Sequence, residues 1–374
     1  MKKILCILLI TATLLSLVSC GDKYAPVEST DEEARVVMTL SLDGEKYEVR
    51  YELYRAMFLT YKSSVDGGDN TVWSGADKAT YISRIHSIIT ERITDIYATL
   101  HHAGQLGINL YSRDVENQIK EYIKISVEGG IYEGETLQGY KSYMAYLKAL
   151  AKLGLNYSVQ ELMLRYTIAI DKINTHYAGE VTDELLDTSL SGGALEYTKE
   201  DVESFYYSDE SVRYMSAFVQ SKYDGALSRA TKLRDKMLAV EGNDYSVAIA
   251  IISNSISLNE DVERGVVIGR HSLDEETYRD LTDAAFSTPI GKVSNVIEIQ
   301  TGYDPGFYIL YPIAKTAEHF DEAYSEIALV YVGNEIGKIL FDVQTALTES
   351  AASTELLNSL DYSGITYPSV EIQQ

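Results

Sequence analysis

The amino-acid sequence predicts an α+β protein with a mostly helical first half, a mixed module of strands and helices, and a long helix near the C-terminus. In the first half, apolar residues return at helical spacing, most clearly from Lys78 to Ala103. Between residues 198 and 315, β-rich stretches and amphipathic stretches follow in the order strand, helices, strand, helix, strand, strand. Helical spacing then returns from Glu318 to Leu347. A length of 374 residues suggests two or three domains.

The helical first half is expected to begin with a β-hairpin. Residues 36–42 are rich in β-branched and apolar side chains, and the tight-turn dipeptide Asp43-Gly44 separates them from a second short strand at 46–49. Residues 78–103 place a row of isoleucines on one helical face. The other features expected in this half are a helix at 51–61, a loop at 64–76, helices at 115–125, 140–153 and 159–177, and a linker at 179–197.

The second half alternates between strands and helices. Thr198 to Asp201 resembles a capping box that opens a short helix, and VRYMSAFVQ at 212–220 is β-rich. Residues 224–240 carry apolar side chains at helical spacing. The other elements expected here are a helix or turn at 245–252, strands at 262–269, 293–299 and 307–313, and a helix at 274–286.

The first 19 residues have the pattern of an export signal. Lys2 and Lys3 precede an apolar run that is short for a membrane-spanning helix, and the run ends in Leu-Val-Ser-Cys-Gly with the cysteine at Cys20. This ending resembles the bacterial lipobox, which implies that Cys20 becomes a lipid-modified N-terminus and that residues 20–35 form a tether. Two acyl chains suffice for lasting attachment. An ordinary cleaved signal with an incidental cysteine is the alternative. Cys6 lies inside the signal, so the mature chain has no other thiol for a disulfide or a metal.

Composition and charge exclude several classes of partner. The net charge is −24, and it becomes −26 once Lys2 and Lys3 leave with the signal. Such a chain repels nucleic acid, whose binding depends on cation–phosphate contacts, and an anionic membrane would hold it only through its lipid. A hydrophobic content of 45% argues against general disorder, and the 30 tyrosines supply amphipathic aromatic surface.

One segment resembles the parvulin-type peptidyl-prolyl isomerases. Residues 283–297, DAAFSTPIGKVSNVI, are similar to the family stretch aaF-x-l-x-x-G-x-[IV]-S-x-[PV]-[IV], and GFYIL follows at 306–310. Val212-Arg213 opens a strand where parvulins carry V-R-A-x-H-I-L, and Gly265 and Gly269 lie where the family has a glycine-rich turn. The resemblance implies a parvulin-like β-α-β-α-β-β module at residues 198–315.

The rest of the chain is similar to extracytoplasmic foldases of the PrsA and SurA kind. In those proteins a strand with Asp-Gly and a set of helices make a chaperone domain, which here corresponds to residues 36–178. The resemblance further implies that the C-terminal helix and tail, residues 316–374, pack back on that domain.

The catalytic histidines of the parvulin family are not present at the matching positions. The first strand histidine aligns with Ser216 and the second with Tyr308. Isomerisation works against an amide barrier of about 18–20 kcal/mol and requires no nucleophile, metal or cofactor, so none is expected. The resemblance makes the following residues candidates for peptide binding: Ser216, Phe218, Tyr278, Leu281 and Tyr308.

The remaining histidines and motifs add little. His271 follows the Gly269 turn near the expected groove, where a functional role stays open beside a structural one. The sequence has no Gly-rich phosphate loop, no Gly-x-Ser-x-Gly elbow and no His-Glu-x-x-His site.

These features favour a membrane-anchored extracytoplasmic folding factor with doubtful isomerase activity. Its expected partners are unfolded or newly secreted polypeptides and, through its lipid, the cell membrane; nucleic acid is excluded and a homodimer is left open. One alternative is an active parvulin-type isomerase with an altered pocket. Another is a solute-binding lipoprotein, against which the helical first half argues.

Overall fold

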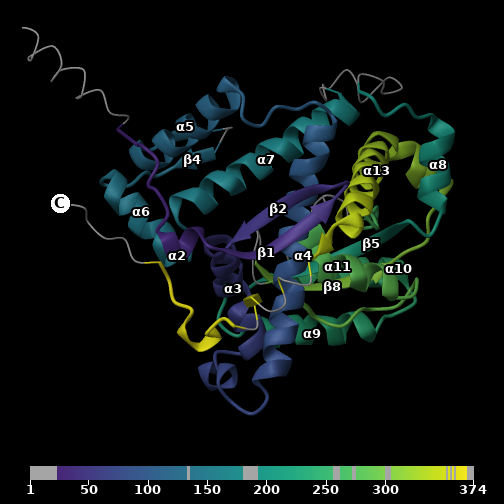
Figure 1. The fold of residues 1–374 in the computed structure, drawn as a ribbon. Helices are drawn as coiled ribbons and strands as arrows, with labels where there is room; N and C mark the ends of the chain where they lie inside the picture. Colours follow the sequence, from purple (N-terminus) through teal and green to yellow (C-terminus); the bar gives the residue numbers. More distant parts are fainter. Residues whose placement is uncertain are drawn as a thin grey trace, which may run out of the picture. The chain divides into compact units, whose positions relative to one another are not determined.

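The computed structural model describes residues 23–132, 135–179, 193–255, 262–271, 275–299, 305–350, 353, 356–357 and 359–368 (Figure 1). The predicted signal, Cys20 and most of the predicted linker at 179–197 lie outside the described residues. The chain divides into two compact units. Unit 1 runs up to Lys172 and resumes at Val343, and unit 2 is Ile173–Asp342. The α+β class is confirmed. None of the helices in the described part combines the length and apolar character of a membrane-spanning segment.

Unit 1 combines long helices with small antiparallel sheets. Three strands pair in the order β2-β1-β9, and two more form the separate hairpin β3–β4. The elements are α2 (Asp31–Ala34), β1 (Val36–Leu42), β2 (Glu45–Arg50), α3 (Tyr51–Asp66), η1 (Asn70–Trp73), α4 (Lys78–Gln105), α5 (Arg113–Glu128), β3 (Gly130–Tyr132), β4 (Glu135–Leu137), α6 (Tyr143–Lys152), α7 (Tyr157–Ala178), β9 (Thr348–Glu349) and η2 (Tyr362–Gly364).

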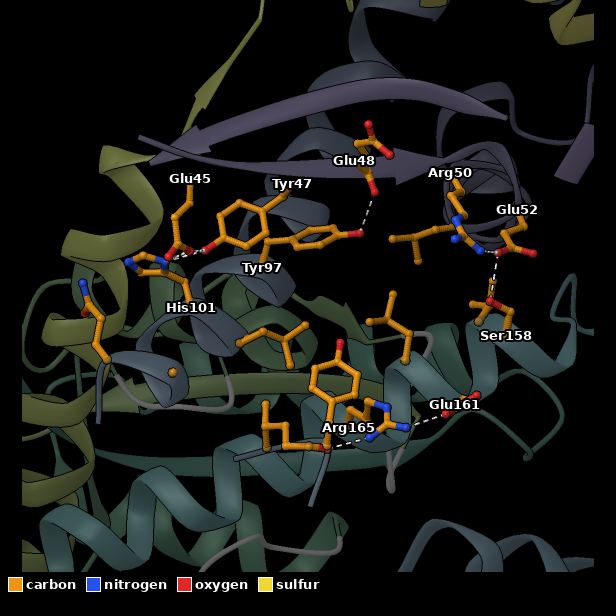
Figure 2. Close-up of a pocket in the computed structure, with 18 residues that line it drawn as sticks. Glu45, Tyr47, Glu48, Arg50, Glu52, Tyr97, His101, Ser158, Glu161 and Arg165 are labelled. Atoms are coloured by element: carbon orange, nitrogen blue, oxygen red, sulfur yellow. Dashed lines mark hydrogen bonds and ion pairs between the residues drawn. The ribbon is translucent and has the colours of Figure 1, made fainter. Parts of the chain in front are cut away.

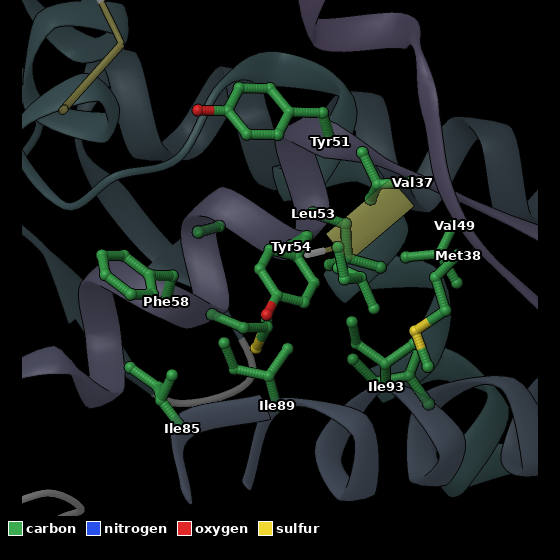
Figure 3. Close-up of a cluster of buried hydrophobic side chains, with 14 of the residues drawn as sticks. Val37, Met38, Val49, Tyr51, Leu53, Tyr54, Phe58, Ile85, Ile89 and Ile93 are labelled. Atoms are coloured by element: carbon green, nitrogen blue, oxygen red, sulfur yellow. The ribbon is translucent and has the colours of Figure 1, made fainter. Parts of the chain in front are cut away.

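The isoleucine row of α4 builds the main core of unit 1. Ile85, Ile89 and Ile93 are fully buried and pack in one cluster with Tyr54 and Phe58 of α3 (Figure 3). Burying an isoleucine side chain contributes about 1.5–3 kcal/mol relative to leaving it exposed. Because successive members of the row are four residues apart, one face of α4 is committed to the core, and side chains on its flank can serve a surface.

Three segments of unit 1 differ from the sequence prediction. Residues 23–35, expected to be a tether, contain the capped helix α2, and Arg55 Nη2 lies 2.8 Å from Glu33 Oε1. The predicted loop 64–76 is shorter, because α3 continues to Asp66 and the buried Trp73 donates its Nε1–H to Asp66 Oδ2 at 2.8 Å. The β3–β4 hairpin was not predicted, since three-residue strands are too short to show a period.

Unit 2 is built around a four-stranded antiparallel sheet in the order β6-β5-β8-β7. Between β5 and β8 the elements follow in the order that the sequence predicts. They are α8 (Lys199–Tyr207), β5 (Ser211–Gln220), α9 (Ala226–Leu238), α10 (Asp244–Asn254), β6 (Val266–Gly269), α11 (Glu275–Ser287), β7 (Ile297–Ile299), β8 (Gly306–Pro312), α12 (Ala317–Glu322) and α13 (Tyr324–Ala346).

The two faces of this sheet belong to two separate cores. Side chains alternate along a strand, so Met215 and Ala217 of β5 face one way and join a cluster with α9 and α10. Tyr214 and Phe218 face the other way and join a cluster that contains Leu281 of α11. The sheet is therefore covered on both sides by helices.

Local details explain where unit 2 departs from prediction. The expected strand at 293–299 is reduced to β7, because Ser294 exchanges hydrogen bonds with Leu310 through its side chain: Ser294 N donates to Leu310 O, and Leu310 N donates to Ser294 Oγ, both at 2.9 Å. The single helix predicted at 318–347 is wrong. It is divided at Ala323 into α12 and α13, at a point where the sequence carries no Gly or Pro.

Candidate functional site

Four of the predicted peptide-binding residues come together on one face of the unit 2 sheet. Phe218 on β5 lies directly opposite Tyr308 on β8, with ring centroids 4.6 Å apart and an interplanar angle of 31°. Ser216 lies two residues before Phe218, opposite Leu310. Leu281 reaches the same cluster from α11. The fifth residue, Tyr278, lies on α11, but its side chain is outside the described part.

This cluster is closed. Ser216 and Tyr308 are 0% exposed, and Phe218 and Leu281 are only 3% and 6% exposed. The side chains that enclose them include Ala285, Ile297, Ile299 and Leu310. A peptide could touch the predicted residues only if α11 moved away from the sheet. In this arrangement the aligned positions act as core residues.

His271 does not join the cluster. Its backbone N–H donates to Asn334 Oδ1 at 2.9 Å, and its ring centroid lies 5.2 Å from that of Phe341 on α13. Burial, together with the nearby Lys338, lowers the pKa of His271. The residue therefore packs against α13 instead of lining a groove by the sheet.

A cavity of about 760 Å³ lies in unit 1, and sequence reasoning did not predict it (Figure 2). Its walls come from β2, the first turn of α3, the end of α4, the stretch before α5, and α7. The lining residues are Glu45, Tyr47, Glu48, Arg50, Glu52, Leu53, Tyr97, Leu100, His101, Gly104, Gln105, Leu110, Tyr111, Ser158, Val159, Glu161, Leu162 and Arg165.

Helical spacing explains how α4 and α7 supply two of the walls. Tyr97 and His101 are four residues apart, so they share one flank of α4 beside the isoleucine row. On α7, Glu161 and Arg165 have the same spacing and interact at 2.5 Å. This four-residue spacing of polar side chains can be seen in the sequence. It identifies a binding site only when the tertiary structure shows that β2 and α7 line the same cavity.

A hydrogen-bonded network lines one side of the cavity. The Tyr47 hydroxyl donates to Glu45 Oε2 at 2.7 Å and lies 2.5 Å from His101 Nδ1. A phenol has one proton, so this arrangement makes Nδ1–H of His101 the donor to the Tyr47 oxygen. The hydrogen bond from Tyr47 lowers the pKa of Glu45, while burial and the same hydrogen bond raise the pKa of Tyr47.

The aromatic wall stays neutral and can donate hydrogen bonds. The ring centroids of Tyr47 and Tyr97 are 5.4 Å apart, and the Tyr97 hydroxyl donates to the backbone oxygen of Glu48 at 3.2 Å. Burial, with the nearby Tyr111, raises the pKa of Tyr97 to about 12. Both rings therefore present an apolar body and a polar tip to the cavity.

The opposite wall is fixed by buried ion pairs and hydrogen bonds. Arg165 is 6% exposed, donates to Leu110 O at 2.5 Å and to Glu116 at 2.6 Å, and lies 4.5 Å from the centroid of the Tyr111 ring. Glu52, 2% exposed, accepts from Asn156 at 2.6 Å and from Ser158 at 2.9 Å. These carboxylates are held by neighbours.

The open face of the cavity is acidic and tyrosine-rich. Glu45 and Glu48 are both exposed, and Glu48 contributes its backbone oxygen to the Tyr97 hydroxyl. Tyr111 is 74% exposed. Leu100 and Leu162 supply partly buried apolar surface between the polar walls. Among the described residues, no cluster of three His, Cys, Asp or Glu side chains is arranged to hold a metal. The arrangement offers a binding surface.

Comparisons with known proteins give matches among solved structures only. No protein-family model matches the chain, and no curated protein matches it. The foldase protein PrsA of Streptococcus pneumoniae str. Canada MDR_19A is 16% identical, with 86% of this chain and 98% of that chain covered and a TM-score of 0.29. Foldase protein PrsA of Lactococcus lactis is 13% identical, with 86% and 98% covered and a TM-score of 0.24. PrsA of Bacillus subtilis is 13% identical, with 91% and 96% covered and a TM-score of 0.23.

Proposed function

We propose that this chain is a membrane-anchored extracytoplasmic folding factor that holds unfolded or newly exported polypeptide segments in the cavity of unit 1. The observation that supports it is the cavity itself, with its combination of leucines, tyrosines and carboxylates. Unfolded segments expose apolar side chains, and tyrosines bind such segments at low conformational cost because they have few rotatable bonds. The export signal and Cys20 supply the expected location outside the cytoplasm.

The carboxylates of the cavity favour segments that also carry a positive charge. Glu45 and Glu48 are exposed residues among those that line the cavity, and Arg165 is already neutralised by Glu116 and Glu161. A client segment with a lysine or arginine flanked by apolar residues would therefore match the negative charge and the apolar surface of the cavity. The net charge of −26 that remains once the signal is removed keeps the protein itself soluble while it holds an aggregation-prone client.

We further propose that the parvulin-like module no longer isomerises prolyl bonds. Ser216 and Tyr308 replace the expected histidines, and both side chains are fully buried. An isomerase needs an open apolar cradle for the proline ring and hydrogen bonds aimed at the twisted amide. The packed cluster offers neither without an opening of α11.

The test of the folding factor is suppression of aggregation by the mature chain carrying Cys20→Ser. Its affinity for a fluorescent, unstructured peptide rich in leucine and lysine is measured by anisotropy in parallel. Tyr111→Ala should weaken peptide binding at least about fivefold, equal to about 1 kcal/mol. Tyr245→Ala removes a comparably exposed tyrosine from unit 2 and is the matched control. Equal peptide binding by the two variants would refute the proposal that the peptide binds in the cavity.

The isomerase alternative is tested by exchange-based proline isomerisation on a short peptide. The proposal predicts no exchange above background. Exchange that persists in the unmodified chain and disappears in Tyr308→Phe would make the protein an enzyme with an altered pocket, because that substitution removes only a hydroxyl.

A second candidate function is solute binding, and the size of the cavity is what favours it. A volume of about 760 Å³ lies within the range of about 300–1,000 Å³ that small-molecule sites occupy. Thermal stabilisation by amino acids, dipeptides or monosaccharides, in a chain that leaves client aggregation unchanged, would establish this reading over the folding factor.

A further inference from the structure

The first described residues of the chain dock on unit 1. Lys23 Nζ lies 2.9 Å from Glu128 Oε1, and the Tyr24 hydroxyl donates to the same oxygen at 2.6 Å. The Tyr143 hydroxyl donates to Ala25 O at 2.8 Å, and the rings of Tyr24 and Tyr143 meet edge to face at 5.5 Å. The chain is thus held at the C-terminal end of α5 and the N-terminal end of α6.

Because Lys23 is docked, only a short stretch of chain connects unit 1 to the lipid that the proposed function places on Cys20. Lys23 follows Cys20 by three residue steps, and an extended chain spans at most about 3.6 Å per residue, or about 11 Å in all. A lipid on Cys20 would therefore keep the junction of α5 and α6 at the membrane. The inference rests on the proposed anchor.

The surface at this junction is unusual for so acidic a chain. No Asp or Glu occurs from Thr136 to Gln160, although the whole chain has 56 acidic residues. The same stretch carries Lys141, Lys148 and Lys152, all exposed. Lys148 and Lys152 are four residues apart on α6, so they project from one face.

Exposed apolar and aromatic side chains lie near the C-terminal end of α5, the helix end that Lys23 and Tyr24 contact. Ile131 is 68% exposed and follows α5 by three residues. Tyr140 is 46% exposed, and its backbone N–H donates to Val127 O at 2.8 Å, which places it at the end of α5 where Lys23 binds. Tyrosine and lysine together are the residues that suit a lipid headgroup region.

We propose that Ile131, Tyr140, Lys141, Lys148 and Lys152, here called the α5–α6 surface, rest against an anionic phospholipid membrane. The lipid on Cys20 brings this surface to the bilayer, and its lysines attract anionic headgroups while the acidic remainder of the chain is repelled. Unit 1 would then be held in a defined orientation at the membrane. A polypeptide client is the competing occupant; the nearby lipid attachment favours the membrane.

The experiment uses the mature, lipidated chain on vesicles of phosphatidylcholine and phosphatidylglycerol that contain a headgroup-quencher lipid. The mature chain has no second thiol, so Tyr140→Cys can be labelled with a fluorophore at a single position. Ser74→Cys is the matched control. Ser74 is exposed in unit 1 and lies just before the start of α4. This helix has 28 residues and is about 42 Å long, and its other end leads to α5.

The proposal predicts strong quenching at position 140 and little at position 74. Replacing Lys141, Lys148 and Lys152 with Gln should lower the ratio of docked to undocked chains about a hundredfold, because each lysine contributes about fivefold near an anionic surface. Pure phosphatidylcholine vesicles or high salt should have the same effect. Flotation of the vesicles reports the anchor independently.

Two outcomes would overturn the proposal in distinguishable ways. Chains that float with the vesicles but show equal quenching at positions 140 and 74 would refute docking and leave the anchor intact. Chains that do not float would refute the anchor and the docking with it. A label at position 140 that ignores the membrane but responds to an unfolded client would assign the α5–α6 surface to polypeptide binding instead.

Discussion

His319 should make unit 2 lose stability as the pH falls below neutrality. The side chain lies on α12 and is 4% exposed, and its Nδ1 is 3.0 Å from the Tyr206 hydroxyl. Burial, followed by the positive charges of Arg213 and Arg264, lowers the pKa of His319 to about 4 from an ordinary value of 6.5. The folded state therefore holds this imidazole neutral where an unfolded chain would protonate it.

The direction and size of the effect follow from proton linkage. Above pH 6.5 the histidine is neutral in both states, and its contribution to stability is complete. Between pH 6.5 and pH 4 the unfolded state binds more protons, so the free energy of unfolding falls with falling pH. A pKa difference of about 2.5 units corresponds to a loss of about 3 kcal/mol over this interval. Below pH 4 the loss is complete.

Urea denaturation at several pH values tests this reasoning. Circular dichroism follows both units, whereas the single tryptophan, Trp73, reports on unit 1. His319→Gln keeps a group that can bond to Tyr206 but cannot titrate, so it should flatten the pH dependence of the unit 2 transition. His176→Gln, at an exposed histidine in the last turn of α7, is the control and should leave the profile unchanged. Parallel profiles for the unmodified chain and His319→Gln would refute the role of this histidine.

Three further substitutions test the packing. Tyr308→Ala should cost about 3–5 kcal/mol in urea unfolding, because it opens a hole in a fully buried cluster; a cost near zero would mean that the cluster is open in solution. Asp66→Ala should cost about 1–3 kcal/mol and shift the fluorescence of Trp73, whose Nε1–H loses its acceptor; an unchanged spectrum would contradict that hydrogen bond. Gly265→Ala should destabilise more than Gly225→Ala. Both glycines have φ near +70°, but only at Gly265 would a Cβ meet a neighbour, the Tyr214 backbone oxygen at 2.9 Å. Equal losses of stability in the two variants would show that the backbone at Gly265 can shift.

Periodicity predicted the long elements well, because burial of one face of a helix or strand requires apolar residues at regular spacing in the sequence. The isoleucines of α4 and the alternation along β5 are of this kind. The break at Ala323 left no mark, since a buried alanine is as suitable inside a helix as at its end. The shortening of β7 depends on the side chain of Ser294 taking a hydrogen bond from Leu310, which is a tertiary event.

The candidate site likewise has features that the local sequence pattern predicts and features that depend on tertiary packing. Alternation and the parvulin resemblance placed Ser216, Phe218 and Tyr308 on one face, and the register of β5 and β8 brings them together. Whether that face is open depends on how closely α11 packs, which no local pattern encodes. The unit 1 cavity escaped prediction for the opposite reason. Its residues are individually ordinary, and only the tertiary fold brings Tyr47 of β2 and Arg165 of α7 to the same cavity.

The closure of the sheet face and the absence of histidine at positions 216 and 308 are best explained together. Burying an imidazole without a partner costs free energy, whereas Ser216 is small and Tyr308 can stack its ring on Phe218. Ser216→His should therefore not produce isomerase activity. It forces a larger, polar side chain into a position that is 0% exposed, and overpacking alone costs about 1–3 kcal/mol. We expect lower stability in urea and no proline exchange from this variant, while Ser216→Ala should stay close to the unmodified chain in stability. A stable Ser216→His variant that catalyses exchange would show that α11 opens readily, and the sheet face would then have to be regarded as a binding groove.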